Sequence, residues 1–254
     1  MHKHKKSLGQ NFLVDKNVIN KILKGVSPLI TDNFLEIGPG EGALTYPLIN
    51  KIASLVVIEK DKRLSIKLSE SFNENNKITV VNNDVLKTEL EKYVDGKIRV
   101  IGNLPYNIAT EIIFFLLNSK IKIQDMHVML QKELIDRIAS LPGNKQYGRI
   151  SVMVQANYEV TKLFDISPNV FEPKPKVWSS YMRLIPKQAV FIDDNHRENF
   201  KRIVTQAFVA RRKMIKTSLK DSISLNKIHH IIGDERIRPE QLSYNQFIEM
   251  AKYV

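Results

Sequence analysis

Short apolar segments alternate with helix-like segments over the first two thirds of the chain, and this alternation limits the folds available to it. We interpret the apolar segments as strands at residues 34–37, 55–58, 78–81, 98–101, 126–130 and 150–155. Apolar strands that are separated by helices are typical of a parallel sheet covered on both faces. The pattern therefore predicts a doubly wound, Rossmann-like α/β domain.

The last part of the chain has a different pattern. From about residue 185 onward the segments are helix-like, which predicts a small all-helical C-terminal domain. We place the two domains at residues 1–188 and 189–254. Near the start of the chain, Asp15 is predicted to cap a helix that ends near Gly25.

The chain carries a formal net charge of +12 and has a pI near 9.6, which suits a polyanionic partner such as a nucleic acid. Residues 197–220 contain eight Lys or Arg and a single acid, and Arg211, Arg212 and Lys213 form their densest run. The alternative is a solvated helical face. The lack of balancing acids favours phosphate contact, to which Lys3, Lys5 and Lys6 could add as a basic arm.

Several classes of protein are disfavoured. The basic N-terminus has no apolar run behind it, and the longest apolar stretch, at 112–117, is too short to span a bilayer. There is no cysteine, and the histidines have no partners at metal-ligand spacing. We expect a cytoplasmic monomer without a metal or a membrane segment.

The glycines of Gly38-Pro39-Gly40-Glu41-Gly42 follow a predicted strand and precede a helical segment. Glycines at this place allow a ligand to approach the backbone closely. The alternative is a tight turn that binds nothing. The spacing is GxGxG, whereas the dinucleotide fingerprint is GxGxxG, which argues against a nicotinamide cofactor.

Carboxylates end the next two predicted strands. Glu59 lies at the spacing expected for an acid that accepts hydrogen bonds from ribose hydroxyls, and Asp84 could accept one from an adenine amino group. Each could alone be an ordinary loop carboxylate. Since parallel strands end at the same edge of a sheet, the two together predict a pocket for an adenosine-containing cofactor.

Asn103-Leu104-Pro105-Tyr106 follows the fourth predicted strand. The lone pair of an adenine N6 is delocalised, but an Asn side-chain oxygen and the Leu104 carbonyl can accept its two hydrogens and free that lone pair for methyl transfer. Tyr106 can stack on the extruded base. The alternative is a Pro-stiffened turn, which the neighbouring strand ends make less attractive.

Several motifs in a fixed order resemble those of a known family, the bacterial small-subunit rRNA adenine-N6,N6-dimethyltransferases, with their eukaryotic dimethyladenosine transferase relatives. The motifs occupy residues 8–13, 35–40, 57–61, 83–86, 102–108, 171–177 and 211–213. The family has a methyltransferase domain that binds S-adenosyl-L-methionine. This resemblance covers the chain from Ser7 to about Leu219.

The resemblance implies a role for each site residue. Asn11 and Leu13 would close over the cofactor, Gly38 would touch its methionine part, and Gly40 would also bind the cofactor. Glu59 would bind the ribose and Asp84 the adenine of the cofactor, while Asn103 would face both cofactor and target amine. Phe171 would stack on the target base opposite Tyr106. Trp178, just beyond this motif, is expected to serve packing.

The resemblance also implies a substrate: two adjacent adenosines in a hairpin loop near the 3′ end of 16S rRNA, within the small ribosomal subunit. The protein would then act in ribosome assembly as well. One alternative is the related large-subunit rRNA methyltransferases that confer macrolide resistance. Another is a non-catalytic RNA-binding assembly factor, which the intact Asn103 and glycine loop disfavour.

Overall fold

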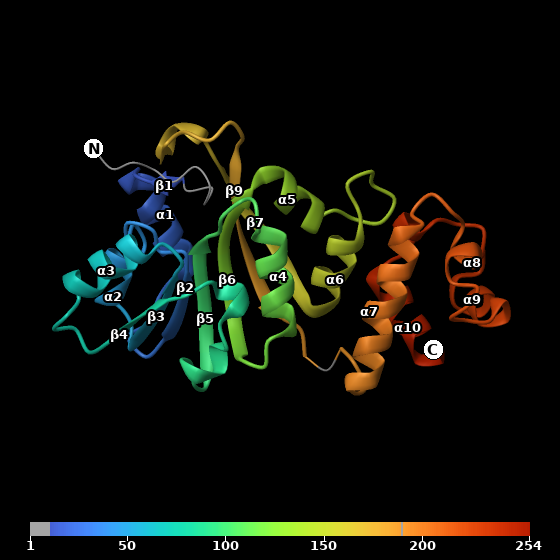
Figure 1. The fold of residues 1–254 in the computed structure, drawn as a ribbon. Helices are drawn as coiled ribbons and strands as arrows, with labels where there is room; N and C mark the ends of the chain where they lie inside the picture. The colour runs from blue at the N-terminus through green and yellow to red at the C-terminus, as the bar shows by residue number, and fades with distance from the viewer. Residues whose placement is uncertain (1–10, 189) are drawn as a thin grey trace. The chain divides into compact units, whose positions relative to one another are not determined.

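The computed structural model describes residues 11–188 and 190–254. Its core is a seven-stranded sheet of strand order β4-β3-β2-β5-β6-β9-β7 (Figure 1). These strands are β2 (Asn33–Ile37), β3 (Ser54–Glu59), β4 (Ile78–Asn82), β5 (Lys97–Asn103), β6 (Lys122–Gln131), β7 (Tyr158–Ile166) and β9 (Ser179–Pro186). Strands β2 to β6 pair in parallel and β9 is antiparallel to β6. The predicted doubly wound α/β class is confirmed.

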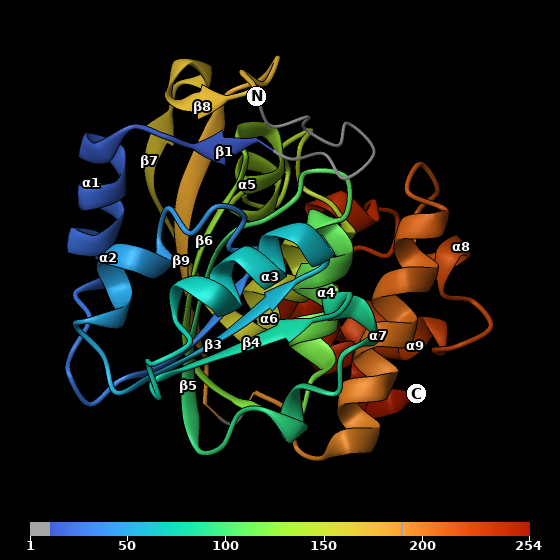
Figure 2. The same ribbon diagram turned by 60° about the vertical axis from the view of Figure 1, so that its left-hand side comes forward.

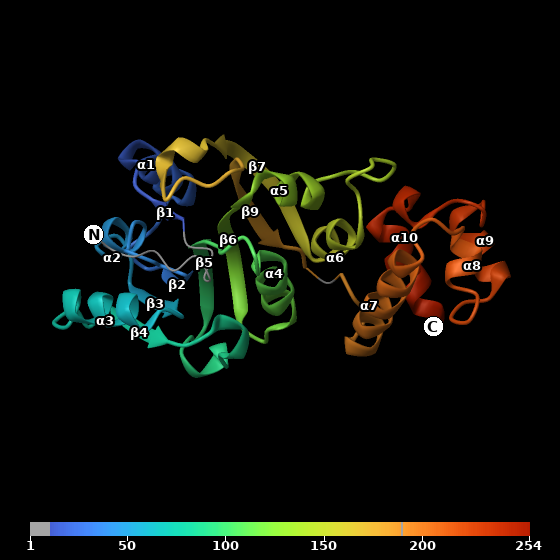
Figure 3. The ribbon, with the colours of Figure 1, turned by 45° about the horizontal axis from the view of Figure 1, so that its top comes forward.

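Helices precede, separate and follow the parallel strands. They are α1 (Lys16–Val26), α2 (Thr45–Ile49), α3 (Lys62–Ser71), α4 (Ala109–Asn118), α5 (Lys132–Ile138) and α6 (Arg149–Asn157), with short 3₁₀ turns η2 (Val85–Lys87), η3 (Leu90–Lys92) and η4 (Pro168–Val170). Figures 1 and 3 show α1 and α2 on one side of the central strands and α4 on the other. Sheet and helices thus enclose the apolar strands from both faces.

Helix α1 begins where the sequence predicted. The Asp15 carboxylate accepts hydrogen bonds from the backbone N–H groups of Asn17 and Val18, at 2.8 and 2.9 Å. Such a cap satisfies donors that have no partner inside the helix. The buried side chains of Ile22 and Leu23 then pack into the core beneath β2 and β3.

The fold has a second, two-stranded sheet, and its first strand directly precedes α1 in the chain. Strand β1 (Phe12–Leu13) pairs antiparallel with β8 (Phe171–Glu172), so two segments far apart in the sequence lie side by side (Figure 2). Only part of the motif at residues 8–13 is visible here, because residues 8–10 lie outside the described residues. The same holds for the basic positions Lys3, Lys5 and Lys6.

The last part of the chain is helical, as predicted. It contains α7 (Asp194–Val209), α8 (Ile215–Ser218), α9 (Leu225–Ile232) and α10 (Tyr244–Met250), with 3₁₀ turns η5 (Pro239–Gln241) and η6 (Ala251–Tyr253). By their contacts the described residues form two compact units. Unit 1 holds the residues up to Ile135 and Thr161–Ile185, and unit 2 holds Asp136–Val160 and Pro186–Val254. The expected boundary between residues 188 and 189 stays a prediction.

The strand predicted at residues 150–155 is wrong, because this segment lies within helix α6. The helix begins after Gly148, whose N–H donates to the Ser151 hydroxyl at 3.0 Å. The Ser151 hydroxyl in turn donates to the Arg137 carbonyl at 2.5 Å. Almost every side chain of α6 is buried, so its apolar residues show no periodicity that could distinguish a helix from a strand.

Trp178 is a further correction. We expected it to serve packing, but its side chain is 52% exposed, at the end of the loop between β8 and β9.

In the described part of the chain, no helix is both long and apolar enough to span a bilayer.

Candidate active site

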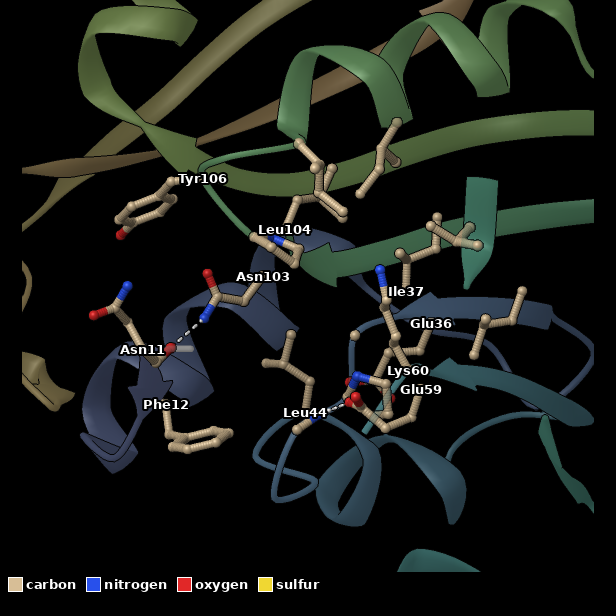
Figure 4. A pocket seen from close by; sticks show the side chains of 18 of the residues that line it. Asn11, Phe12, Glu36, Ile37, Leu44, Glu59, Lys60, Asn103, Leu104 and Tyr106 are labelled. Carbon is tan, nitrogen blue, oxygen red and sulfur yellow. Dashed lines mark hydrogen bonds between the residues drawn. The ribbon is translucent and has the colours of Figure 1, made fainter. Parts of the chain in front are cut away.

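A pocket in unit 1 lies where the parallel strands β2 to β5 end (Figure 4). Such strand ends are the usual ligand site of open α/β sheets. Predicted residues that line this pocket are Asn11, Leu13, Gly38, Gly40, Glu59, Asp84, Asn103, Leu104 and Tyr106. The fold thus brings together nearly all of the side chains that the sequence placed in the site.

The glycine loop turns sharply after β2. Gly38 and Gly40 have positive φ angles of 66° and 59°, which L side chains rarely adopt. A Cβ added to Gly40 would lie 2.9 Å from the Phe12 ring, which packs over this loop from β1. Both backbone geometry and space therefore require glycine at position 40.

Glu59 is held rigidly beneath this loop. One of its carboxylate oxygens accepts from the Gly40 N–H at 3.0 Å and the other from the Asp61 N–H at 2.8 Å. Burial nevertheless raises the pKa of Glu59, since only 6% of the residue is exposed. The fixed carboxylate keeps lone pairs directed at the pocket that can accept from hydroxyl groups.

Asp84 lies at the end of β4, opposite Lys60. The Lys60 ammonium donates to one Asp84 oxygen at 2.8 Å and the Leu86 N–H to the other at 3.1 Å. The hydrogen bond from Lys60 is the main reason that the pKa of Asp84 is lowered. The carboxylate is thus charged and oriented at neutral pH.

Glu36 is a pocket residue that sequence reasoning missed. It lies within β2, is 1% exposed, and accepts a hydrogen bond of 2.7 Å from the Thr45 hydroxyl. Burial raises the pKa of Glu36 to about 7, and the nearby Glu59 adds to this rise. The available signal was an acid inside an apolar strand next to a glycine loop. Phe12 and Lys60 also line the pocket and were not singled out.

The Asn103 side chain has a defined orientation. Its Nδ2 donates to the Asn11 backbone carbonyl at 2.9 Å, so that its Oδ1 is left as an acceptor (Figure 4). Asn11 directly precedes β1, which β8 holds in place. The segment before α1 therefore sets the direction of the amide that ends β5.

Tyr106 stands beside Asn103 at the same end of the pocket (Figure 4). Its hydroxyl lies 2.5 Å from the Ser179 hydroxyl at the start of β9. Burial raises the pKa of Tyr106, so the phenol stays neutral at physiological pH. The ring is half-buried and its orientation is fixed through β9.

Phe171 is buried in packing between the two small strands. It is 4% exposed, pairs with Leu13 between β8 and β1, and belongs to the core cluster under α1. It does not line this pocket, and the stacking on a target base that the resemblance implies stays a prediction. Its aromatic character is used in packing that positions β1.

Arg211, Arg212 and Lys213 lie in unit 2, in the exposed turn after α7. The Arg211 guanidinium donates to the Lys145 carbonyl at 2.8 Å and lies 3.7 Å from the Glu240 carboxylate. The turn therefore has a defined shape that presents these cations to solvent. Within residues 11–188 and 190–254, no group of three or more His, Asp or Glu is placed to hold a metal ion.

The family model for ribosomal RNA adenine dimethylase matches residues 1–254. The chain belongs to the ribosomal RNA adenine dimethylase family. The resemblance seen in its motifs is thereby confirmed, as is the prediction of an rRNA adenine dimethyltransferase.

Two relatives of the dimethylase are each named ribosomal RNA small subunit methyltransferase A. The protein of Legionella pneumophila (strain Corby) is 44% identical over 253 residues, which cover 100% of this chain and 98% of the relative. That of Xylella fastidiosa (strain Temecula1) is 42% identical, covering 97% of this chain and 94% of the relative. The similarity thus extends over both units.

Solved structures share the dimethylase fold at lower identity. A dimethyladenosine transferase from Plasmodium falciparum aligns with a TM-score of 0.81 at 23% identity, over 94% of this chain and 95% of that one. The 23S rRNA methyltransferase ErmE aligns with a TM-score of 0.75 at 24% identity, over 96% and 99%. Both support the fold.

Proposed function

We propose that this dimethylase transfers methyl groups from S-adenosyl-L-methionine to the N6 atoms of two adjacent adenosines in small-subunit rRNA. The observation that carries the proposal is the orientation of Asn103. Its Nδ2 is fixed on the Asn11 carbonyl and its Oδ1 is left to accept in the pocket that Glu59 and Asp84 also line.

The residues of the pocket suit the cofactor. Glu59 would accept from the ribose hydroxyls, Asp84 from the adenine amine, and the backbone at Gly38 and Gly40 would lie along the methionine. The buried Glu36 and Glu59 supply negative charge for a cationic ligand. When bound, the cofactor supplies a methyl group on a positively charged sulfur.

In the proposed first transfer, Asn103 Oδ1 and the Leu104 carbonyl would accept the two N6 hydrogens of the target adenine, and in the second transfer one of them would accept the single remaining N6 hydrogen. The nitrogen lone pair would then be free to accept the methyl group, which the bound cofactor would supply by giving up the bond from its sulfur to that methyl. The amine, acidic once methylated, loses a proton to water. No general base is needed, so catalysis rests on positioning and electrostatics. A neutral Tyr106 ring would stack on the base.

The names of the relatives support the choice of the small subunit. We place the two target adenosines in a hairpin loop near the 3′ end of 16S rRNA, where bases are partly unstacked and cost less to extrude than in a duplex. The protein would act on subunits during assembly, in the cytoplasm. The likeness to ErmE is one of fold and does not favour large-subunit RNA.

The test is transfer of labelled methyl groups to small subunits purified from cells that lack the modification. Mature small subunits and large subunits serve as controls, followed by nucleoside analysis. We expect N6,N6-dimethyladenosine in the unmodified small subunit alone. Label in large-subunit RNA would reassign the substrate, and binding without transfer would refute the catalytic proposal.

We also propose that Arg211, Arg212 and Lys213 contact RNA phosphates. Changing all three to Ala should weaken RNA binding and make the plot of log affinity against log salt shallower by about 2, at roughly 0.7 per phosphate on single strands. Binding is measured by filter retention between low and moderate salt.

The matched control for this triple variant removes the same charge from paired sites. Lys92, Lys201 and Lys252 each form an ion pair with a carboxylate three residues earlier. Their triple Ala variant should keep the slope of the original protein. If both triple variants reduced the slope by the same amount, only net charge would matter, and the turn after α7 would make no specific contact.

A further inference from the structure

Trp178 is an exposed aromatic residue at the end of the loop between β8 and β9. It is the sole Trp of the chain and its side chain is 52% exposed. The two residues that follow it, Ser179 and Ser180, are fully buried at the start of β9. The exposure of the indole is therefore local, and sheet packing does not use the ring.

The backbone at Trp178 is fixed relative to the catalytic end of the pocket. Its carbonyl accepts a hydrogen bond of 2.9 Å from the Lys132 N–H, at the start of α5. The next residue, Ser179, lies with its hydroxyl 2.5 Å from the Tyr106 hydroxyl. Trp178 directly precedes Ser179, the residue that contacts Tyr106. Because consecutive Cα atoms are about 3.8 Å apart, the Trp178 backbone lies close to this contact.

Two exposed lysines precede the indole on its own loop, while the acids nearby in sequence are Glu172 and Glu133. Lys174 and Lys176 are exposed on the same loop, and the Lys132 ammonium lies 3.3 Å from Asp165. Val177, 43% exposed, is the apolar neighbour, so the apolar surface is small. An isolated aromatic ring flanked by lysines suits an unstacked base and its phosphates better than the larger apolar face that a protein partner needs.

We propose that Trp178 stacks on the nucleotide adjacent to the target adenosine and so helps to hold single-stranded RNA at the active site. The proposal rests on the proposed function, because it assumes that the target base lies on Tyr106. A flipped base loses its stacking neighbours, and so does the nucleotide next to it. The indole of Trp178, on the residue before Ser179, would offer that nucleotide an aromatic surface and so compensate for the lost stacking.

The kinetic test uses unmethylated small subunits as substrate. Trp178→Ala is expected to raise KM for the subunit by about 5- to 150-fold, the range that corresponds to losing one base–aromatic stack. Its kcat at saturating substrate should change far less, since the cofactor pocket is intact. Trp178→Phe should restore most of the affinity, whereas Trp178→Leu, which is apolar but lacks a π face, should not.

The matched control is Tyr93→Ala. Tyr93 is 41% exposed and precedes β5, at the opposite end of the strand from Asn103. We expect it to leave KM unchanged. An unchanged KM for Trp178→Ala, or equal rescue by Phe and Leu, would overturn the proposal.

A second measurement does not depend on catalysis. Because Trp178 is the sole Trp, indole fluorescence reports on this residue alone. A short oligoadenylate should quench the emission in a saturable manner, and inorganic polyphosphate of equal charge should not. Equal responses to the two polyanions, or no response to the oligoadenylate, would contradict stacking. If no variant transfers methyl groups, the proposed function fails, and the fluorescence result still decides the role of Trp178.

Discussion

Asn103→Ala is expected to lower kcat for methyl transfer by about 100- to 1,000-fold, the typical effect of removing one preorganised polar group from a transition state. The variant leaves the Leu104 carbonyl as the single acceptor for the target amine, so the nitrogen lone pair stays delocalised. The measurement is single-turnover transfer to unmethylated small subunits. Calorimetry with S-adenosyl-L-methionine should show a much smaller change in affinity.

Two further variants separate the roles of the Asn103 amide. Asn103→Asp keeps an acceptor oxygen but loses the donor to the Asn11 carbonyl, and the two oxygens would then repel each other. We therefore expect it to lose activity and to weaken the attachment of the segment before α1. Asn118→Ala, which removes an exposed hydrogen bond from an Asn side chain to the Phe114 carbonyl, is the matched control. If folded Asn103→Ala retained a kcat within about threefold of the original, far less than such a loss costs, the amide would not be the positioning group.

Much of the site could be predicted because the ends of the strands can be recognised in the sequence. Glu59, Asp84 and Asn103 each lie within three residues of the end of an apolar run, and parallel pairing brings such ends to one edge. Glu36 was missed because acids are rarely buried in the interior of a strand, so a single Glu within an apolar run did not indicate a pocket residue. Its burial depends on the Thr45 hydroxyl, which local pattern does not reveal.

What the sequence did not reveal has a common physical origin in tertiary packing. Phe171 is buried because β8 pairs with β1, a contact between segments about 160 residues apart that no local pattern encodes. Trp178 is exposed because it lies before the buried start of β9, although a Trp is buried more often than not. Helix α6 was mistaken for a strand because its surroundings bury nearly all of its faces.

The stability of the protein should fall as the pH rises from about 5 to about 7, and Glu36 should account for much of the fall. Its pKa is raised from 4.5 to about 7, so the folded state holds a proton that the unfolded chain releases over this range. The free energy of unfolding is therefore highest below the unfolded pKa of 4.5. It falls as the pH rises towards the folded pKa of about 7, and above that pH it falls no further. The whole change corresponds to about 3 kcal/mol, at roughly 1.4 kcal/mol per pKa unit.

Glu36→Gln should remove most of this dependence, because Gln does not titrate and can still accept the hydrogen bond from Thr45, while the raised pKa of Glu59 leaves a smaller part of it. The measurement is urea unfolding at several pH values from 5 to 8, on Glu36→Gln and on Glu70→Gln, a change at an exposed position of α3. Only the first should flatten the curve. Parallel curves for the original protein and Glu36→Gln would show that Glu36 does not titrate in this range.

A carboxylate that destabilises the empty protein near neutral pH has a physical rationale in this pocket. Glu36 and the buried Glu59 both line it, and burial raises the pKa of each. A cationic ligand would favour their ionised forms and recover the energy that their burial costs. Saturating S-adenosyl-L-methionine should therefore flatten the pH dependence of the original protein, as Glu36→Gln does without ligand. A ligand that stabilised the protein equally at pH 5 and pH 8 would mean that Glu36 does not respond to its charge.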